Sequence, residues 1–150
     1  MAWQRTARED FACPPSALWA VVGDPRRWPE WCDAVGPVVM TEPVRVGAQL
    51  RYEPAGRVSG ALHRRTAPPM RVTDCRPERR LTIEQPIPTG AMTVEWLIDP
   101  TTTAGGEPGC VLAQRIAVGG LLSPAVVVGV AAGLASSWSR SVVRLHALLA

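Results

Sequence analysis

The sequence predicts an α+β domain in which a curved, seven-stranded antiparallel sheet wraps around one long C-terminal helix. Within residues 35–118, apolar and polar residues alternate in short runs, a pattern typical of antiparallel strands with one buried face. The last 27 residues instead repeat apolar residues at helical spacing. Fifteen prolines and thirteen glycines interrupt the chain, which leaves room for only this one long helix. At 150 residues, the chain is expected to form a single domain, 1–150.

Two short helices are expected between the first strand and the rest of the sheet. Residues 3–12 are predicted to form the first strand. Pro14 and Pro15 then open a helix that ends at Gly23, because proline is favoured at the start of a helix and glycine at its end. A second helix over about 25–33 presents two tryptophans, three residues apart, on one face.

The other six strands are identified from their alternation. They are expected near residues 36–42, 48–54, 69–76, 80–86, 91–99 and 109–118. Leu50 and Tyr52, for example, alternate with Arg51 and Glu53, and the later strands repeat this pattern. The sheet is therefore expected to have one apolar face and one charged face. Residues 56–68 fit either a further pair of strands or a loop.

The C-terminal helix is predicted over residues 124–150, a length of about 40 Å. Ser123 and Pro124 are typical of an N-cap followed by the first helical position. The apolar residues of one stripe are Val127, Ala131, Leu134, Trp138, Val142, Leu145 and Leu149. Because this stripe and the apolar face of the sheet each need a partner, the helix is expected to lie in the concavity of the sheet.

Charge is local and does not favour nucleic-acid binding. The net charge is +3, and all sixteen basic residues are arginines. Seven of them lie within residues 57–80, where only Asp74 and Glu78 oppose them, so this segment carries +5. No aromatic residue lies between Tyr52 and Trp96 to provide a stacking surface, so we interpret the segment as a solvated strand face.

The cysteines and the N-terminus indicate a cytoplasmic protein with free thiols and no metal. Cys13, Cys32, Cys75 and Cys110 form no CxxC pair and have no histidine at ligand spacing, so we expect no zinc site. The polar segment MAWQRTARED does not resemble a secretion signal. No glycine-rich nucleotide motif is present, so no cofactor is expected.

One segment has to be considered as a membrane span. Residues 116–139 contain no charged residue over 24 positions. The segment nevertheless contains several glycines and serines and the pair Ser123-Pro124, which indicate the end of a strand, a turn and half of a helix. No stable membrane insertion is therefore expected.

Several segments in this order of elements are typical of one known superfamily. They are FACPPSALWAVVGDPRRWPEW at 11–31, the short strand after Gly47, the turn Cys75-Arg76-Pro77 leading to Leu81, and the pair TVEWLIDP and GCVL within 93–112. On these segments the chain resembles the START-like superfamily known as SRPBCC, and within it the polyketide cyclase/dehydrase branch. The resemblance implies a helix-grip fold, which hosts many different activities.

An internal cavity of about a few hundred Å³ is expected between the sheet and the helix. Beside Trp138 the helix offers only Ala131, Gly133 and Ala135, which are too small to fill the space above a curved sheet. Trp96 and Trp138 are expected to approach each other across this interior. The residues predicted to bind a ligand there are Leu50, Tyr52, Met70, Val72, Ile83, Trp96, Leu112, Gln114, Leu134 and Trp138.

Three polar residues are candidates for chemistry in this cavity. Tyr52, the only tyrosine, shares the apolar parity of its strand, and a buried phenol usually needs a partner. Gln114 shares its parity with Leu112 and Ile116, so its amide is a candidate to point inward, where an unpaired polar group costs about 1–3 kcal/mol. His63, in an arginine-rich segment, is a candidate general base, although a surface histidine is the simpler interpretation.

Three functions are compatible with these features. The first is binding of a hydrophobic small molecule, aromatic or polyketide- or lipid-like, in the cavity. The second is a polyketide cyclase or aromatase, in which Tyr52, His63 or Gln114 assists proton transfer. The third is a structural or partner-binding module. Binding is favoured because the sequence offers few titratable groups that could point inward. The oligomeric state is left open.

Overall fold

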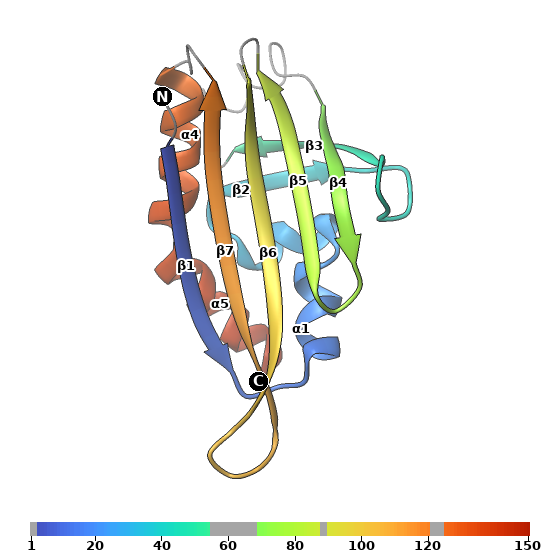
Figure 1. Cartoon of the computed structure of the whole chain (residues 1–150), viewed down its shortest axis with the longest axis vertical. Coiled ribbons are helices and arrows are strands. Elements are labelled where there is room, and N and C mark those ends of the chain that lie inside the picture. Colours follow the sequence, from blue (N-terminus) through green and yellow to red (C-terminus); the bar gives the residue numbers. More distant parts are fainter. Residues whose placement is uncertain (1–2, 55–68, 88–89, 121–124) are drawn as a thin grey trace.

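The architecture is a seven-stranded antiparallel sheet that curves around helices packed on its inner face, as the sequence predicted (Figure 1). This computed structural model describes residues 3–54, 69–87, 90–120 and 125–150, without the side chains of 53–54, 125–128 and 130. The strands are β1 (Trp3–Phe11), β2 (Val35–Val39), β3 (Gln49–Pro54), β4 (Met70–Arg76), β5 (Arg80–Ile87), β6 (Gly90–Thr102) and β7 (Pro108–Gly120). The helices are α1 (Pro15–Val22), the 3-10 turn η1 (Pro25–Arg27), α2 (Trp28–Trp31), α4 (Ala125–Ser136) and α5 (Trp138–Leu149).

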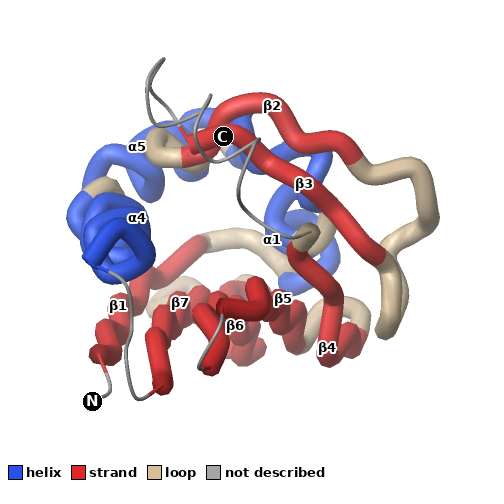
Figure 2. The backbone as a smooth tube through the Cα atoms, turned by 90° about the horizontal axis from the view of Figure 1, so that it is seen from above, coloured by secondary structure: helices blue, strands red, loops and turns tan. Residues whose placement is uncertain are grey.

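The strand order is β1-β7-β6-β5-β4-β3-β2, with every neighbouring pair antiparallel. β3 and β4 pair through only two register positions, Gln49 with Arg71 and Leu50 with Met70. Beyond this short contact, β2 and β3 fold over the interior and face the layer formed by β1 and β4–β7 (Figure 2). The sheet therefore encloses a space that the helices close from the side.

The alternation in the sequence assigns the two faces of the sheet correctly. The inward side chains of the strands are buried, among them Leu50, Met70, Ile83, Trp96 and Leu112. Gly90 marks where β6 begins against the end of β7, because a Cβ at this position would overlap the carbonyl oxygen of Gly119. β6 and β7 are the longest strands and pair along their whole length, and the core lies on their inner face.

The segment predicted as a second helix over 25–33 is shorter in the structure. Asp24 caps η1 by accepting a hydrogen bond from the backbone nitrogen of Arg26 at 3.1 Å, and α2 adds only one α-helical turn. Both tryptophans of α2 are nonetheless buried, so the two-tryptophan face predicted for this segment is confirmed.

The predicted helix over 124–150 is not continuous, because it breaks at Ser137. Ser137 has φ −80° and ψ −5°, so its ψ departs from the helical value of about −42°. Its hydroxyl donates to the carbonyl of Leu134 at 2.8 Å, and the hydroxyl of Ser136 donates to that of Gly133 at 3.1 Å. Serine hydroxyls that bond to carbonyls of the preceding turn bend a helix. The consecutive serines Ser136 and Ser137 therefore separate α4 from α5.

Polar contacts fix α5 to the segment around α2. Arg140 Nε lies 2.6 Å from Asp33 Oδ2, and the backbone nitrogen of Asp33 donates to Ser141 Oγ at 3.1 Å. Arg144 donates to the carbonyl of Pro29 at 3.0 Å. The side chains described in α4 that join the core, Ala131 and Leu134, are apolar. Polar contacts thus hold α5, whereas the described core contacts of α4 are apolar.

We predict that aspartate at position 142 unfolds the domain whereas aspartate at position 143 does not. The Val142 side chain is 7% exposed and faces the interior, while its neighbour Val143 is 68% exposed. Val142→Asp should lower the free energy of unfolding by at least about 3 kcal/mol, because it buries an unpaired carboxylate. Val143→Asp should change it by about 0.5 kcal/mol or less. Urea unfolding followed by circular dichroism measures both, and equal effects would contradict the packing of α5.

Candidate functional site

A small apolar cavity lies between the sheet and the elements that cover it. Its lining residues are Trp28, Val35, Tyr52, Met70, Ile83, Val94, Trp96 and Leu134. They come from α2, from the strands β2 to β6 and from the end of α4. The space that the centre of a water molecule can occupy is about 20 Å³, which is little more than one water requires.

Tryptophans of α2 pack against Trp96 in the interior where the sequence analysis expected a cavity. The ring centroids of Trp28 and Trp96 are 4.6 Å apart, and the ring of Trp31 meets Trp96 edge-on at 6.4 Å. The expectation that Trp96 faces Trp138 is not met among the ring contacts described. These two indoles therefore occupy part of the space between the sheet and the helices, and Trp28 also lines the described cavity.

Five of the ten residues predicted to bind a ligand line this cavity. They are Tyr52, Met70, Ile83, Trp96 and Leu134. The other five do not line it: Leu50, Val72, Leu112 and Gln114 are buried elsewhere in the interior, and Trp138 is half-buried against the core. His63 lies outside the described residues.

Three lining residues were missed by the sequence analysis. Trp28 and Val94 had been placed on apolar faces, but the sequence does not show that α2 inserts between the layers of the sheet. Val35 lies at the start of β2, next to a bulge in the β2–β3 pairing, where strand parity gives no reliable direction. Whether these three residues line the cavity depends on the curvature of the sheet.

Tyr52 is a buried phenol in the wall of the cavity. Burial raises its pKa to about 12, and the nearby thiol of Cys32 adds to the effect when it is ionised. The side chain is therefore protonated at neutral pH and can act as a hydrogen-bonding group. It is poorly suited to accept a proton as a general base in this pH range.

Among the described residues, three buried nitrogen donors in the interior have no hydrogen-bond partner. They are Nε1 of Trp31, Nε1 of Trp96 and Nε2 of Gln114. Gln114 lies directly opposite Trp96 in the β6–β7 ladder, so the two side chains share the inner face. Each unpaired donor costs about 1–3 kcal/mol, so the interior has a deficit of hydrogen-bond acceptors.

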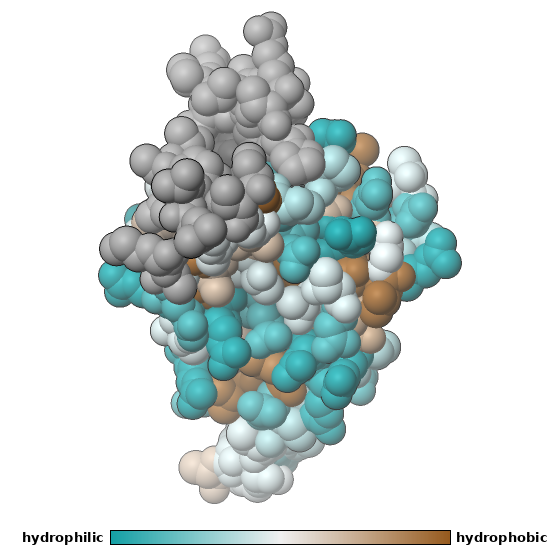
Figure 3. Space-filling model, turned by 45° about the horizontal axis from the view of Figure 1, so that its top comes forward, coloured by the Kyte–Doolittle hydropathy of each residue, from teal (hydrophilic) through white to brown (hydrophobic). Residues whose placement is uncertain are grey.

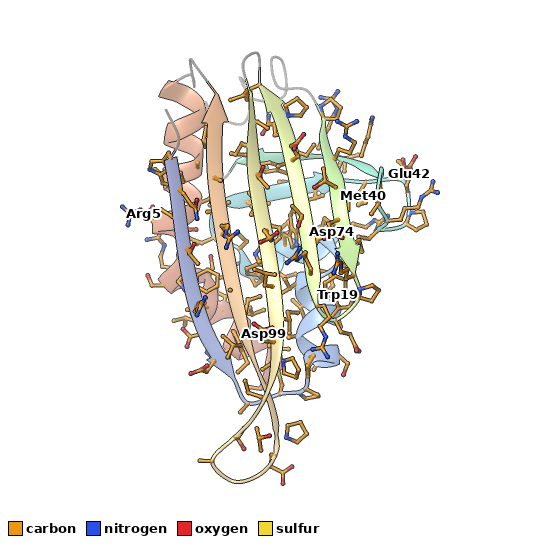
Figure 4. All side chains as sticks on the ribbon, viewed as in Figure 1. Arg5, Trp19, Met40, Glu42, Asp74 and Asp99 are labelled. Carbon is orange, nitrogen blue, oxygen red and sulfur yellow. The ribbon has the colours of Figure 1, made fainter. Side chains whose placement is uncertain are left out.

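Charged side chains lie on the outer face of the sheet. Glu95 accepts a hydrogen bond from Thr82 Oγ1 at 3.2 Å and lies within 4 Å of Arg80 and Arg115. Asp74, labelled in Figure 4, belongs to the same outer face. No charged residue is among those that line the described cavity. Figure 3 shows the corresponding surface, where hydrophilic colour dominates and apolar colour is confined to small patches.

The cysteines are free and two of them have strongly raised pKa values. Burial raises the pKa of Cys32 to about 11 and that of Cys110 to about 12, the latter also through its contact with Cys13. Both thiols are therefore protonated at neutral pH, a form that is a poor nucleophile and a poor metal ligand. Within the described part of the chain, no three His, Cys, Asp or Glu residues are grouped to hold a metal ion.

The described helices do not have the properties of membrane spans. Among the described residues, no helix combines the length and the apolar character that a membrane span requires. This agrees with the interpretation of the uncharged segment as a strand end followed by a helix.

A curved antiparallel sheet that grips a C-terminal helix over an apolar interior defines the helix-grip class of proteins. Comparison with known protein families matches residues 3–150 to the family described as polyketide cyclase/dehydrase and lipid transport. The chain belongs to this family, part of the SRPBCC group. The resemblance drawn from the sequence is thus confirmed.

Solved structures share the fold at low sequence identity. The Zhui aromatase/cyclase from Streptomyces sp. R1128 is 15% identical, with a TM-score of 0.60, and the match covers 99% of this chain and 92% of that one. XoxI from Bacillus cereus is 13% identical, with a TM-score of 0.63 and coverage of 96% and 93%. MLL2253 from Mesorhizobium loti is 16% identical, with a TM-score of 0.61 and coverage of 98% and 96%. No curated protein sequence matches the chain.

We predict that Tyr52 ionises only near pH 12 in the folded protein. Because Tyr52 is the only tyrosine, tyrosinate absorbance at 295 nm reports this residue alone. The midpoint should lie near 12 in buffer and near 10 in urea, since burial disfavours the phenolate. The folded-state pKa is the higher one, so the stability it contributes is complete below about pH 10 and is lost as the pH rises to about 12. A native midpoint near 10 would show that the phenol is solvated.

Proposed function

We propose that this protein binds a hydrophobic small molecule, aromatic or polyketide- or lipid-like, between the inner face of the sheet and the C-terminal helices. The observation that carries the proposal is the apolar cavity, whose lining combines two indoles with aliphatic side chains and one phenol. Such a lining suits a planar apolar ligand, because aromatic rings gain from stacking and from the removal of apolar surface from water. Membership of a family described by both cyclisation and lipid transport supports the same class of ligand.

Binding of such a ligand in the described cavity requires this cavity to widen. A space of about 20 Å³ for water centres is far below the several hundred Å³ of typical ligand sites. The walls contributed by β4, β5 and β6 are held by ladder hydrogen bonds. The opposite wall includes Trp28, Val35 and Leu134, which come from three separate elements. Movement of these elements away from the sheet, with rotation of the adaptable Met70 side chain, would make room.

Cyclisation of a polyketide chain is the alternative function, and the structural similarity to an aromatase/cyclase supports this alternative. That reaction needs a group that gives or takes a proton beside the bound chain. Tyr52 stays protonated up to about pH 12, and the amide of Gln114 does not titrate near neutral pH. Binding is therefore the better supported function for the described residues.

We predict that the tryptophan fluorescence of the protein is quenched saturably by micromolar 1-tetralone, a bicyclic aromatic ketone, and by palmitate. Trp96 lines the cavity, so Trp96→Phe should remove most of the response and weaken binding by about tenfold. Trp19, labelled on α1 in Figure 4, does not line the cavity, so Trp19→Phe should leave the response intact. Bound ligand should also raise the melting temperature, because it stabilises only the folded state.

Two results would contradict the proposal. A response that does not saturate with either compound would mean that the interior does not admit a ligand. Equal loss in Trp96→Phe and Trp19→Phe would mean that binding occurs elsewhere. Mass spectrometry of the same mixtures, repeated with a linear poly-β-ketone, separates the two functions: recovery of unchanged compound supports binding alone, and a cyclised product supports the alternative.

A further inference from the structure

We propose that Trp96 and Gln114 form a recognition pair for a neutral carbonyl oxygen of the ligand. This inference rests on the proposed function and goes beyond it, because it names the chemical group that the apolar interior selects. Two of the three unpaired donors, Trp96 Nε1 and Gln114 Nε2, belong to side chains that lie opposite each other on β6 and β7. A carbonyl oxygen has two lone pairs and can accept from both.

The packing requirements of the core do not explain these unpaired donors. Trp28, in the same aromatic cluster, donates from its Nε1 to the carbonyl of Val22 at 2.9 Å. The fold can therefore supply an acceptor for the nitrogen of a buried indole in this cluster. Trp96 and Trp31, which contact each other edge-on, have no such acceptor, and neither has Gln114. Three donors without acceptors in one interior indicate a group that must be supplied from outside the chain.

The chemistry of the surroundings selects a neutral acceptor. An indole nitrogen can only donate, so the complementary group must carry a lone pair. None of the residues lining the described cavity is charged, and Glu95 and Arg115, which flank this part of the sheet, lie on its outer face. A carboxylate would therefore lose its hydration without gaining a cation, whereas a ketone loses little. The predicted ligand is an apolar molecule that carries a ketone or a similar carbonyl group.

The ligand must reach donors that are covered in the closed interior. Gln114 is 5% exposed and Trp96 is 3% exposed. Trp96 also lines the cavity, so one member of the donor pair borders the apolar space. Widening of the interior, which the proposed function already requires, would bring a ligand carbonyl to both nitrogens.

The first test concerns the protein without ligand. Gln114→Met keeps the length of the side chain and removes the unpaired amide, so the melting temperature should rise by about 3 °C or more. The matched control is Thr82→Val, which removes a buried polar group that has a partner, Glu95, on the outer face. This control should lower the melting temperature. If Gln114→Met lowers it as well, the amide is paired within the fold and the inference is overturned.

The second test compares three bicyclic probes of nearly the same shape. The parent should bind 1-tetralone at least about fivefold more tightly than tetralin, which lacks the oxygen, and more tightly than 1,2,3,4-tetrahydro-1-naphthoate, which is charged. Gln114→Met should bind 1-tetralone and tetralin about equally. Trp19→Phe, at an indole that does not line the cavity, should keep the preference for the ketone.

The outcomes separate this inference from the proposed function. Equal, saturable binding of 1-tetralone and tetralin to the parent would leave hydrophobic binding standing and overturn the carbonyl assignment. Tighter binding of the carboxylate would overturn it too, since it would require a cation near the donors. If no probe binds, the proposed function fails together with the assignment.

Discussion

The packing of the α2 tryptophans against Trp96 is the interaction on which the rest of the structure depends. Trp96 lies in β6, between β5 and β7 in the sheet, and α2 belongs to the segment that connects β1 with β2. By contacting Trp96, Trp28 and Trp31 fix this connection over the inner face. Asp33, two residues beyond α2, then holds Arg140 of α5 at 2.6 Å. The position of α5 over the sheet thus follows, through α2, from one aromatic cluster.

The same cluster determines the chemistry of the interior. Large indoles remove water from the space between the layers, so polar groups there are costly unless they are paired. The fold meets this requirement at Trp28, whose ring nitrogen has a backbone acceptor, and leaves it unmet at Trp96 and Gln114. Charges are meanwhile kept on the outer face, around Glu95. The interior combines apolar walls with unused donors, which is the combination expected of a site for an apolar molecule with an acceptor group.

The sequence predicts the sheet and its faces well because strand alternation is a local property. It locates the strands and places Leu50, Met70, Ile83 and Gln114 on the inner face, where their side chains are indeed buried. It does not predict that Trp28 lines the described cavity, because that depends on where α2 lies over the curved sheet and not on the periodicity. The break at Ser137 was missed for a related reason: the apolar stripe continues across it, and only the hydroxyl contacts with the preceding turn reveal it.

That break has a consequence for the dynamics of the domain. The contacts of Asp33, Pro29 and Ser141 tie α5 to the rest of the protein, and the ring of His146 stacks on Phe11 of β1 at 4.2 Å. The described core contacts of α4 are made by small or aliphatic side chains and end in Leu134, at the cavity wall. The two helices are therefore expected to form separate cooperative units, with faster amide hydrogen exchange in α4 than in α5. The sequence pattern of one continuous helix would then correspond to two units in the folded protein: α5, which stays fixed, and α4, which moves more freely.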